Sequence, residues 1–251
     1  MPSRYNTRMR SGIAAVAFDL DGTLYPNYRL NIRLIPFFFK EWRLLLAFGK
    51  ARNILHSGRP DKLAPDNARA GRQPDFYQEQ ATLTAAVLGR RAENIKDKIE
   101  TQIYRGWEPH FKKIRLYNCV KQTLETFRAA GLKMGLLSDF PPKTKMEYLG
   151  IGGYWDAVLC SEETGVLKPA SLPFLKLAQA LKTDPAQILY VGNSLKYDVI
   201  GAKQAGMQAA LINRLCLRKT QPESKGAESG NSGRPDFVFR DYRQLCNYVL
   251  S

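Results

Sequence analysis

Two acidic side chains, Asp19 and Asp21, follow a short apolar run and have the types and spacing that phosphoryl transfer requires. In an open parallel sheet the carboxyl ends of the strands face the crevice that binds ligands, and both carboxylates leave the run at 13–18 together. One carboxylate could attack phosphorus, while the other could protonate the leaving oxygen and later activate water. Gly22 would let backbone N–H groups come close to a phosphoryl group. An ordinary Asx turn is the alternative for such a pair.

Apolar runs that are each followed by a polar or glycine-containing turn predict six buried strands of a parallel sheet. Between the later runs lie helical patterns, most of which end at glycine, the residue that helix C-caps favour. The alternation predicts an α/β fold with a doubly wound parallel sheet. The predicted strands span residues 13–18, 133–137, 157–160, 188–191, 209–212 and 237–239, and the helices between them span 120–130, 144–149, 172–181 and 198–205.

A long insertion separates the first predicted strand from the second. Its pattern is helical, with an exposed loop rich in Gly, Pro, Asp and Arg at 57–74, and a second polar loop is predicted at 218–235. We therefore predict an α/β core domain of residues 1–24 and 116–251 and a helical cap domain of residues 25–115. The predicted cap helices span 34–48, 78–88 and 92–104.

The sequence DLDGT at 19–23 resembles the first motif of the haloacid dehalogenase superfamily, whose members are mostly phosphatases. The resemblance implies that Asp19 is the nucleophile, that Asp21 is the general acid/base, and that Thr23 supplies a supporting hydroxyl. It also implies a Rossmann-like core, and the place of the insertion is the family's usual place for a helical cap. Such a cap closes over the site and recognises the leaving group of the substrate.

The second and third motifs of the family have counterparts after the next two predicted strands. Ser138 matches the hydroxyl residue that binds a phosphoryl oxygen, and Lys168, followed by Pro169, matches the lysine that neutralises charge on the nucleophile and the phosphate. Asp139 stands where the family often has Asn. A phosphate would repel this carboxylate unless it turns away or pairs with a cation.

The fourth motif, commonly GDxxxxD, is present here as GNxxxxD, with Asn193 in place of the first acid and Asp198 as the second. The resemblance implies a Mg²⁺ ion held by the Asp19 carboxylate, the Asp21 carbonyl and the Asn193 side chain. Because an amide carries no formal charge, we expect a lower metal affinity. Asp198 would orient Lys168 or a metal-bound water.

The composition is that of a folded chain. The 251 residues are 44% apolar, and no stretch reaches the roughly 18 uninterrupted apolar residues of a membrane span. The first residues lack the apolar run of a signal peptide, so we expect a cytoplasmic protein. The cysteines have no CxxC spacing, which favours reduced thiols over a disulfide framework or a zinc site. They are Cys119, Cys160, Cys216 and Cys246.

The formal charge of +15 is concentrated in the predicted cap, where residues 25–115 hold 18 basic and nine acidic side chains. Such charge is typical of a solvated face, but it also favours a substrate with negative charge beyond the phosphate. Residues 34–48 are unusually apolar and aromatic. We expect them to pack in the cap core; contact with a membrane surface, or with a lipid-like leaving group, is the alternative.

Together these features predict a Mg²⁺-dependent phosphatase that acts on a small phosphorylated metabolite. Phosphomutase chemistry shares all four motifs. Dehalogenases of the family characteristically lack the second Asp of DxD, so Asp21 argues against carbon–halogen hydrolysis. A non-catalytic module that binds phosphate or nucleic acid, with a decayed metal site at Asn193, is a further alternative, although nucleic acid is not the partner that we favour. The motifs do not indicate the oligomeric state.

Overall fold

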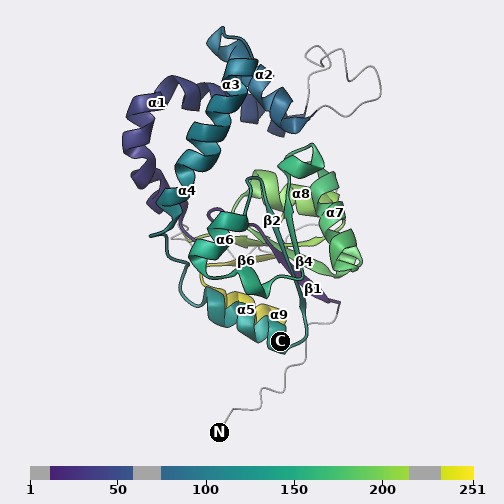
Figure 1. Ribbon diagram of the computed structural model, residues 1–251. Coiled ribbons are helices and arrows are strands. Elements are labelled where there is room, and N and C mark those ends of the chain that lie inside the picture. The colour runs from purple at the N-terminus through teal and green to yellow at the C-terminus, as the bar shows by residue number, and fades with distance from the viewer. Residues whose placement is uncertain (1–11, 59–74, 215–232) are drawn as a thin grey trace.

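The computed structural model describes residues 12–58, 75–214 and 233–251, and Figure 1 shows the path of the chain. The two predicted loops, at 57–74 and 218–235, lie mostly outside the described residues, as does Cys216. None of the helices among the described residues combines the length and the apolar content that crossing a membrane would require.

Six parallel strands form one sheet in the order β3-β2-β1-β4-β5-β6. Phe18 in β1 lies beside Leu136 of β2 on one side and Val191 of β4 on the other. The strand order reverses at β1, and in such sheets the crevice beyond the carboxyl ends at this point binds ligands. The predicted α/β fold is confirmed. The strands are β1 (Ala15–Phe18), β2 (Lys133–Ser138), β3 (Ala157–Cys160), β4 (Ile188–Gly192), β5 (Gln208–Ile212) and β6 (Phe237–Phe239).

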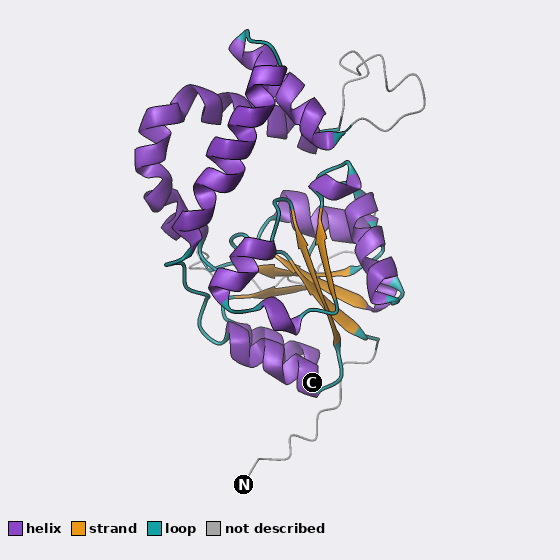
Figure 2. Cartoon of the chain, viewed as in Figure 1, coloured by secondary structure: helices purple, strands orange, loops and turns teal. Residues whose placement is uncertain are grey.

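Helices cover both faces of the sheet (Figure 2). Because side chains alternate along a strand, Val16 and Phe18 enter one apolar core, whereas Ala15 and Ala17 enter the other. The small alanines leave room for the large side chains of the second helix layer. The first face carries α5 (Val120–Ala129), α6 (Lys143–Leu149) and α9 (Tyr242–Val249), and the second carries α7 (Ser171–Leu181) and α8 (Ile200–Gln204). Short helical turns are η4 (Gly152–Tyr154), η5 (Glu162–Thr164), η6 (Pro185–Gln187) and η7 (Leu195–Val199).

The helices between β1 and β2 gather at one end of the sheet (Figure 1). They have an apolar cluster of their own, which includes Leu44 and Phe48. Local signals fix the limits of α2: the Asp75 side chain accepts a hydrogen bond from the N–H of Tyr77, and Gly89 ends the helix in the left-handed region. These helices are α1 (Asn27–His56), α2 (Phe76–Leu88), α3 (Glu93–Lys98), the π-helical segment η3 (Ile99–Tyr104) and α4 (Arg105–Phe111).

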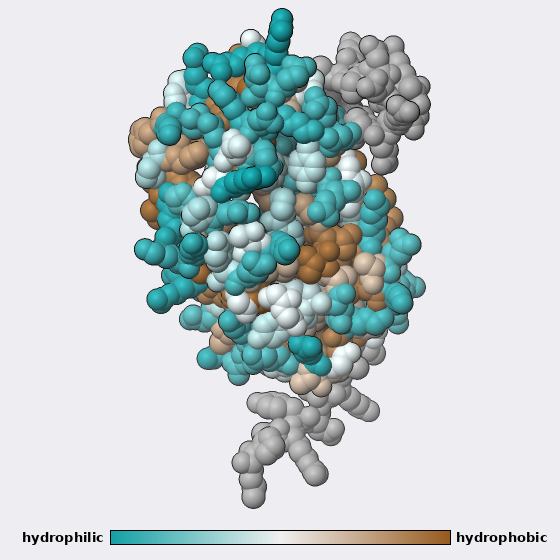
Figure 3. All heavy atoms as spheres, viewed as in Figure 1, coloured by the Kyte–Doolittle hydropathy of each residue, from teal (hydrophilic) through white to brown (hydrophobic). Residues whose placement is uncertain are grey.

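Helix α1 is longer than predicted, and much of its apolar surface faces solvent. The backbone leaves the helical region at Glu41, where the helix bends. The prediction that this segment packs in the cap core holds for residues such as Leu44 and Phe48 but is wrong for a row of side chains three or four residues apart, because only one side of α1 meets the neighbouring helices. Apolar spheres lie along the edge where α1 runs (Figure 3). The exposed side chains are Tyr28, Ile32, Ile35, Phe38, Phe39, Trp42 and Leu46.

Candidate active site

The Asp19 carboxylate is fixed at both oxygens directly beyond β1. The N–H of Asp19 continues the pairing with β4 by donating to the Val191 carbonyl at 2.9 Å. Lys168 Nζ donates to Asp19 Oδ1 at 2.7 Å, and Thr23 Oγ1 donates to Oδ2 at 2.7 Å. Burial raises the pKa of the Asp19 carboxyl to about 7, while the Lys168 ammonium opposes that rise. The carboxylate therefore keeps one orientation, as the predicted nucleophile would require.

Lys168 is held from its other side by Asp198. The distance from Lys168 Nζ to Asp198 Oδ1 is 2.8 Å. Asp198 Oδ2 accepts the backbone N–H groups of Asn193 and Ser194, at 3.1 and 2.9 Å. Although burial favours the neutral amine, Asp19 and Asp198 raise the pKa of Lys168 well above its usual value. Of the two roles foreseen for Asp198, this geometry corresponds to the orientation of Lys168.

The Asp21 carboxylate faces a second lysine, Lys145 of α6, which no motif had marked. Lys145 Nζ donates to Asp21 Oδ1 at 2.8 Å and to Oδ2 at 2.6 Å. The Tyr25 hydroxyl donates to Oδ1, and Ser138 Oγ donates to Oδ2 at 3.3 Å. Burial alone would raise the pKa of Asp21, but Lys145, aided by Tyr25, lowers it below its usual value. Asp21 is therefore ionised in this arrangement.

Asp139 turns away from the crevice that Ser138 faces. Ser138 is fully buried, and its Oγ accepts the N–H of Phe140 at 3.2 Å. Asp139 Oδ1 instead accepts the backbone N–H of Lys168 at 3.3 Å, and its carbonyl accepts a hydrogen bond from Arg52 Nη2 at 3.1 Å. Its carboxylate thus connects the loop after β2 to the loop that carries Lys168. Asp139 therefore does not face the crevice, where it would repel a phosphate.

Two of the three oxygens assigned to magnesium converge on the Thr23 hydroxyl. Thr23 Oγ1 lies 2.7 Å from Asp19 Oδ2 and 3.4 Å from Asn193 Oδ1. Gly22 lets Asn193 approach, since a Cβ at this position would lie 2.3 Å from Asn193 Nδ2. Among the described residues, no three or more His, Cys, Asp or Glu side chains are arranged to hold a metal ion. The predicted Mg²⁺ ligands are of a different kind, because only the Asp19 side chain among them belongs to these residue types. These oxygen donors fit Mg²⁺.

The C-terminal end of α1 packs against the loops that carry the site. Arg52 forms a buried ion pair with Glu162 of η5. His56 Nδ1 lies 2.5 Å from the Lys168 carbonyl oxygen, and the His56 ring lies 4.4 Å from the ring of Tyr197, centroid to centroid. Burial lowers the pKa of His56, which favours the neutral ring. The helices inserted after β1 are thereby joined to the loops after β3 and β4.

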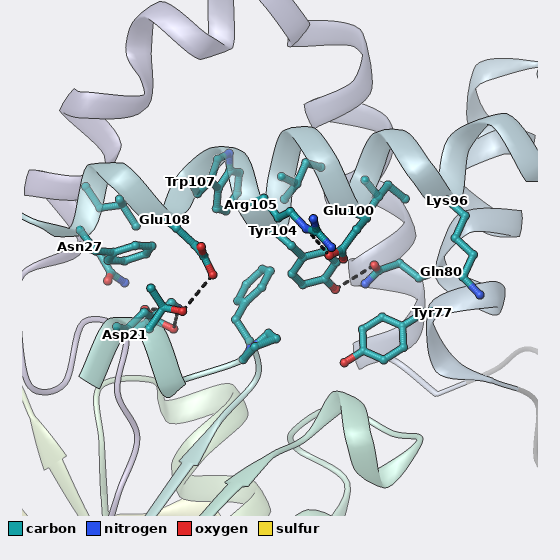
Figure 4. A pocket seen from close by; sticks show the side chains of 18 of the residues that line it. Asp21, Asn27, Tyr77, Gln80, Lys96, Glu100, Tyr104, Arg105, Trp107 and Glu108 are labelled. Carbon is teal, nitrogen blue, oxygen red and sulfur yellow. Dashed lines mark hydrogen bonds and ion pairs between the residues drawn. The ribbon is translucent and has the colours of Figure 1, made fainter. Parts of the chain in front are cut away.

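A cavity of about 980 Å³ opens beside Asp21, with walls from the inserted helices and from the chain after β2. Figure 4 shows Asp21 and Asn27 at one end of the cavity and Tyr77 and Lys96 at the other.

The sequence matches the model of a known family. The family model described as haloacid dehalogenase-like hydrolase matches residues 13–206, well over half of the chain. The chain belongs to the haloacid dehalogenase-like hydrolases. The predicted family is confirmed.

Curated relatives of this hydrolase include phosphatases. It is 26% identical over 244 residues to the glyceraldehyde 3-phosphate phosphatase of Methanopyrus kandleri, covering 94% of this chain and 97% of that protein. It is 31% identical over 220 residues to the ribulose-1,5-bisphosphate 5-phosphatase of Halopiger xanaduensis, covering 79% and 84%. These similarities confirm the enzyme class, a hydrolase of phosphatase type.

Solved structures share the fold of this hydrolase. A dehalogenase structure with an intermediate complex superposes with a TM-score of 0.62 at 15% identity, covering 97% of this chain and all of that one. At this identity the likeness concerns the fold alone.

The strand-end residues singled out from sequence lie together in the structure, whereas Lys145 and Tyr25 were missed. Tyr25 follows the first motif and had no distinguishing pattern. Lys145 had one weak signal, since it lies beside Met146 on the buried side of α6. A lysine on an apolar helix face calls for a partner. The residues brought together are Asp19, Asp21, Gly22, Thr23, Ser138, Lys168, Asn193 and Asp198.

Proposed function

We propose that this hydrolase cleaves a phosphomonoester of a small metabolite through an aspartyl phosphate on Asp19, in a reaction that depends on Mg²⁺. The observation that carries the proposal is the Asp19 carboxylate, fixed between Lys168 and Thr23 at the carboxyl end of β1. The Lys168 ammonium lowers the repulsion between this carboxylate and the phosphoryl oxygens. The phosphatase relatives support the same type of reaction.

In the first half-reaction an Asp19 oxygen bonds to phosphorus, and the bond from phosphorus to the leaving oxygen breaks. Asp21 gives a proton to that oxygen, so the product leaves as a neutral alcohol. Ser138 Oγ donates a hydrogen bond to a phosphoryl oxygen. Because Asp21 is ionised while it pairs with Lys145, it must first take up this proton from solvent water, and this requires the pair with Lys145 to loosen.

In the second half-reaction a water molecule attacks phosphorus, and Asp21 accepts a proton from that water. The bond from phosphorus to the Asp19 oxygen then breaks, which restores the carboxylate and releases inorganic phosphate. The ionised Asp21 held by Lys145 has the protonation state that this step requires.

We assign Mg²⁺ to the Asp19 carboxylate, the Asp21 carbonyl and the Asn193 side chain. When bound, the ion would neutralise charge on the phosphoryl oxygens. The site also has charge to balance, because its described side chains include more carboxylates than ammonium groups. These are the carboxylates of Asp19, Asp21 and Asp198 and the ammonium groups of Lys145 and Lys168.

Phosphate release from p-nitrophenyl phosphate and a metabolite panel, with and without Mg²⁺, tests this function. We expect Mg²⁺-dependent release that falls more than about a thousandfold in Asp19→Asn. Asp184→Asn is the matched control, since Asp184 is an exposed helix cap and Asn caps nearly as well. Activity that survives Asp19→Asn would exclude the proposed nucleophile. An inactive native chain across the whole panel would favour a non-catalytic phosphate-binding module.

A further inference from the structure

The leaving alcohol must occupy the cavity beside Asp21. Under the proposed function Asp21 protonates the leaving oxygen, and Asp21 lines one end of this space. The cavity volume of about 980 Å³ reaches the upper end of the roughly 300–1,000 Å³ found for sites of drug-sized ligands. A leaving group as small as glycolate would leave most of the space to water.

The cations in the cavity wall are already paired with carboxylates. Asp97 and Glu108 add negative charge to the wall, so the described wall residues include more acidic than basic side chains. A second anionic group on the substrate would be repelled here. The three pairs are Lys145 with Asp21 at 2.6 Å, Lys96 with Asp75 at 3.0 Å, and Arg105 with Glu100 at 2.9 Å.

The cavity wall therefore does not share the positive charge of the helices around it. Several basic side chains of α1, such as Arg29, Lys40 and Arg43, are exposed to solvent instead. The expectation that the basic cap selects a substrate with further negative charge finds no support in this wall.

A row of aromatic rings runs along the cavity, starting at the site itself. Phe140 lies two residues after Ser138, and its backbone N–H donates to Ser138 Oγ. The Phe140 ring centroid lies 6.1 Å from that of Tyr104 and 6.0 Å from that of Trp107. Tyr104 lies 6.0 Å from Tyr77, which stands at the far end in Figure 4. At such separations rings attract one another, and an added ring would find faces and edges to pack against.

We propose that the leaving group is a bulky, uncharged alcohol with an aromatic ring, so that the substrate is an aryl or arylalkyl phosphomonoester. This inference rests on the proposed phosphatase function and adds the chemical class of the leaving group. The phosphoryl group lies at Asp19, and the ring of the leaving group packs along Phe140 and Tyr104. The names of the relatives point to other substrates, a triose phosphate and a sugar bisphosphate.

Three substrates with primary alcohol leaving groups test the proposal, because their chemical reactivity is similar. They are naphthylethyl phosphate, ethyl phosphate and phosphoglycolate, assayed with Mg²⁺ on the native chain. We expect kcat/KM for naphthylethyl phosphate to exceed that for ethyl phosphate by about a hundredfold, from burial of the rings. Phosphoglycolate, which adds a carboxylate, should be the poorest of the three.

Two variants locate the effect in the cavity. Tyr77→Ala should reduce the preference for naphthylethyl over ethyl phosphate by about tenfold. Tyr148→Ala removes a partly exposed ring of α6 outside the cavity and should leave the preference unchanged. Glu108→Gln keeps a hydrogen-bond acceptor for Thr144 but removes a charge, and it should raise kcat/KM for phosphoglycolate about fivefold. A misfolded chain could not produce such a gain.

Failure of this inference can be told apart from failure of the phosphatase function. If phosphoglycolate is the best of the three substrates while turnover still requires Asp19, the leaving-group proposal is wrong and the phosphatase function stands. Calorimetry with naphthylethyl phosphonate and ethyl phosphonate gives a readout without turnover. We expect the naphthylethyl compound to bind at least about tenfold more tightly, and equal affinities would overturn the inference even in an inactive chain.

Discussion

Lys145 keeps the Asp21 carboxylate ionised and in one orientation. Its ammonium contacts both Asp21 oxygens and lies 5.0 Å from the ring centroid of Phe111 and 5.2 Å from that of Phe140. The side chain is buried, so little water competes for the pair. A buried ammonium between two rings and a carboxylate holds that carboxylate in one orientation.

Replacement of Lys145 by Met should therefore slow the reaction more than it weakens binding. The Met side chain fills a similar volume, but Asp21 loses its partner and its fixed orientation. We expect kcat with ethyl phosphate, whose leaving oxygen needs a proton, to fall about 10- to 100-fold, within the range for general acid–base groups, and Lys145→Arg to restore part of it. Lys143→Met, an exposed change on the same helix, is the control. An unchanged kcat would mean that Lys145 has no positioning role.

Asn193→Asp tests the metal assignment directly. A carboxylate at this position adds a charge to an oxygen donor that lies 3.4 Å from Thr23 Oγ1, the hydroxyl that also donates to Asp19. Mg²⁺ should then bind more tightly, by about tenfold in titration calorimetry. Asn94→Asp, which adds the same charge on α3, should leave the affinity as it is. Unchanged or weaker binding in Asn193→Asp would mean that Asn193 is not a ligand.

The sequence predicts that the motif residues lie close together, because each of them follows a strand. The carboxyl ends of parallel strands share one edge, so residues as distant as Asp19 and Lys168 come together there. Lys145 was not predictable in this way, since its reach to Asp21 depends on how α6 is turned against the core. The orientation of Asp139 likewise depends on a backbone N–H in another loop.

At the scale of elements, a buried ion pair contributes to the attachment of α1 to the core. Arg52 pairs with Glu162, its guanidinium carbon lies 3.9 Å from the Phe140 ring centroid, and Tyr104 donates to Glu162 at 2.8 Å. Burial raises the pKa of Glu162, and Arg52 opposes that rise. Removal of either partner would leave a buried group without its counterpart.

Arg52→Met should lower the free energy of unfolding by about 3–5 kcal/mol, the usual cost of leaving one partner of a buried pair alone. Adding Glu162→Gln should recover most of that loss, because no uncompensated charge remains. Denaturant unfolding measures both. Arg105→Met breaks an exposed pair with Glu100 and should cost no more than about 1 kcal/mol. Equal losses in the single and double variants would contradict the explanation.

The strands and helix α2 were predictable to within about two residues, whereas the ends of the other helices of the insertion were not. The predicted helix at 92–104 corresponds to α3 and η3 and continues into α4, despite Gly106 and Pro109. Local propensity predicts an end near these residues, but burial of Phe111 against the core favours continuation. The C-terminal end of α1 was predicted too early for a similar reason. Contacts of Arg52 and His56 hold this part of the helix against loops that are distant in sequence, and local propensity does not indicate such contacts.

At the scale of the whole molecule, α1 presents an apolar row beside basic side chains. Phe39 and Trp42 are 76% and 49% exposed, and Lys40 and Arg43 beside them are exposed as well. This combination is typical of helices that lie on anionic membrane surfaces. The exposure of the row favours the membrane alternative that the sequence left open.

We therefore expect the chain to co-sediment with anionic phospholipid vesicles and not with zwitterionic ones. The double variant Phe39→Ser and Trp42→Ser should abolish most of the binding, because it removes apolar area that would enter the lipid interface. Leu175→Ser, which changes an exposed apolar residue on α7, is the control. Sedimentation in the absence of vesicles would indicate self-association through this row instead.

The contacts of α1 with the site loops also bear on how phosphate leaves. His56 packs on the loop whose Lys168 would hold the phosphoryl oxygens, and Arg52 packs on the loop after Ser138. A movement of α1 away from the core would therefore break contacts with both of these loops. Under the proposed function phosphate would bind between these loops, and we expect it to stabilise the contacts that α1 makes with them.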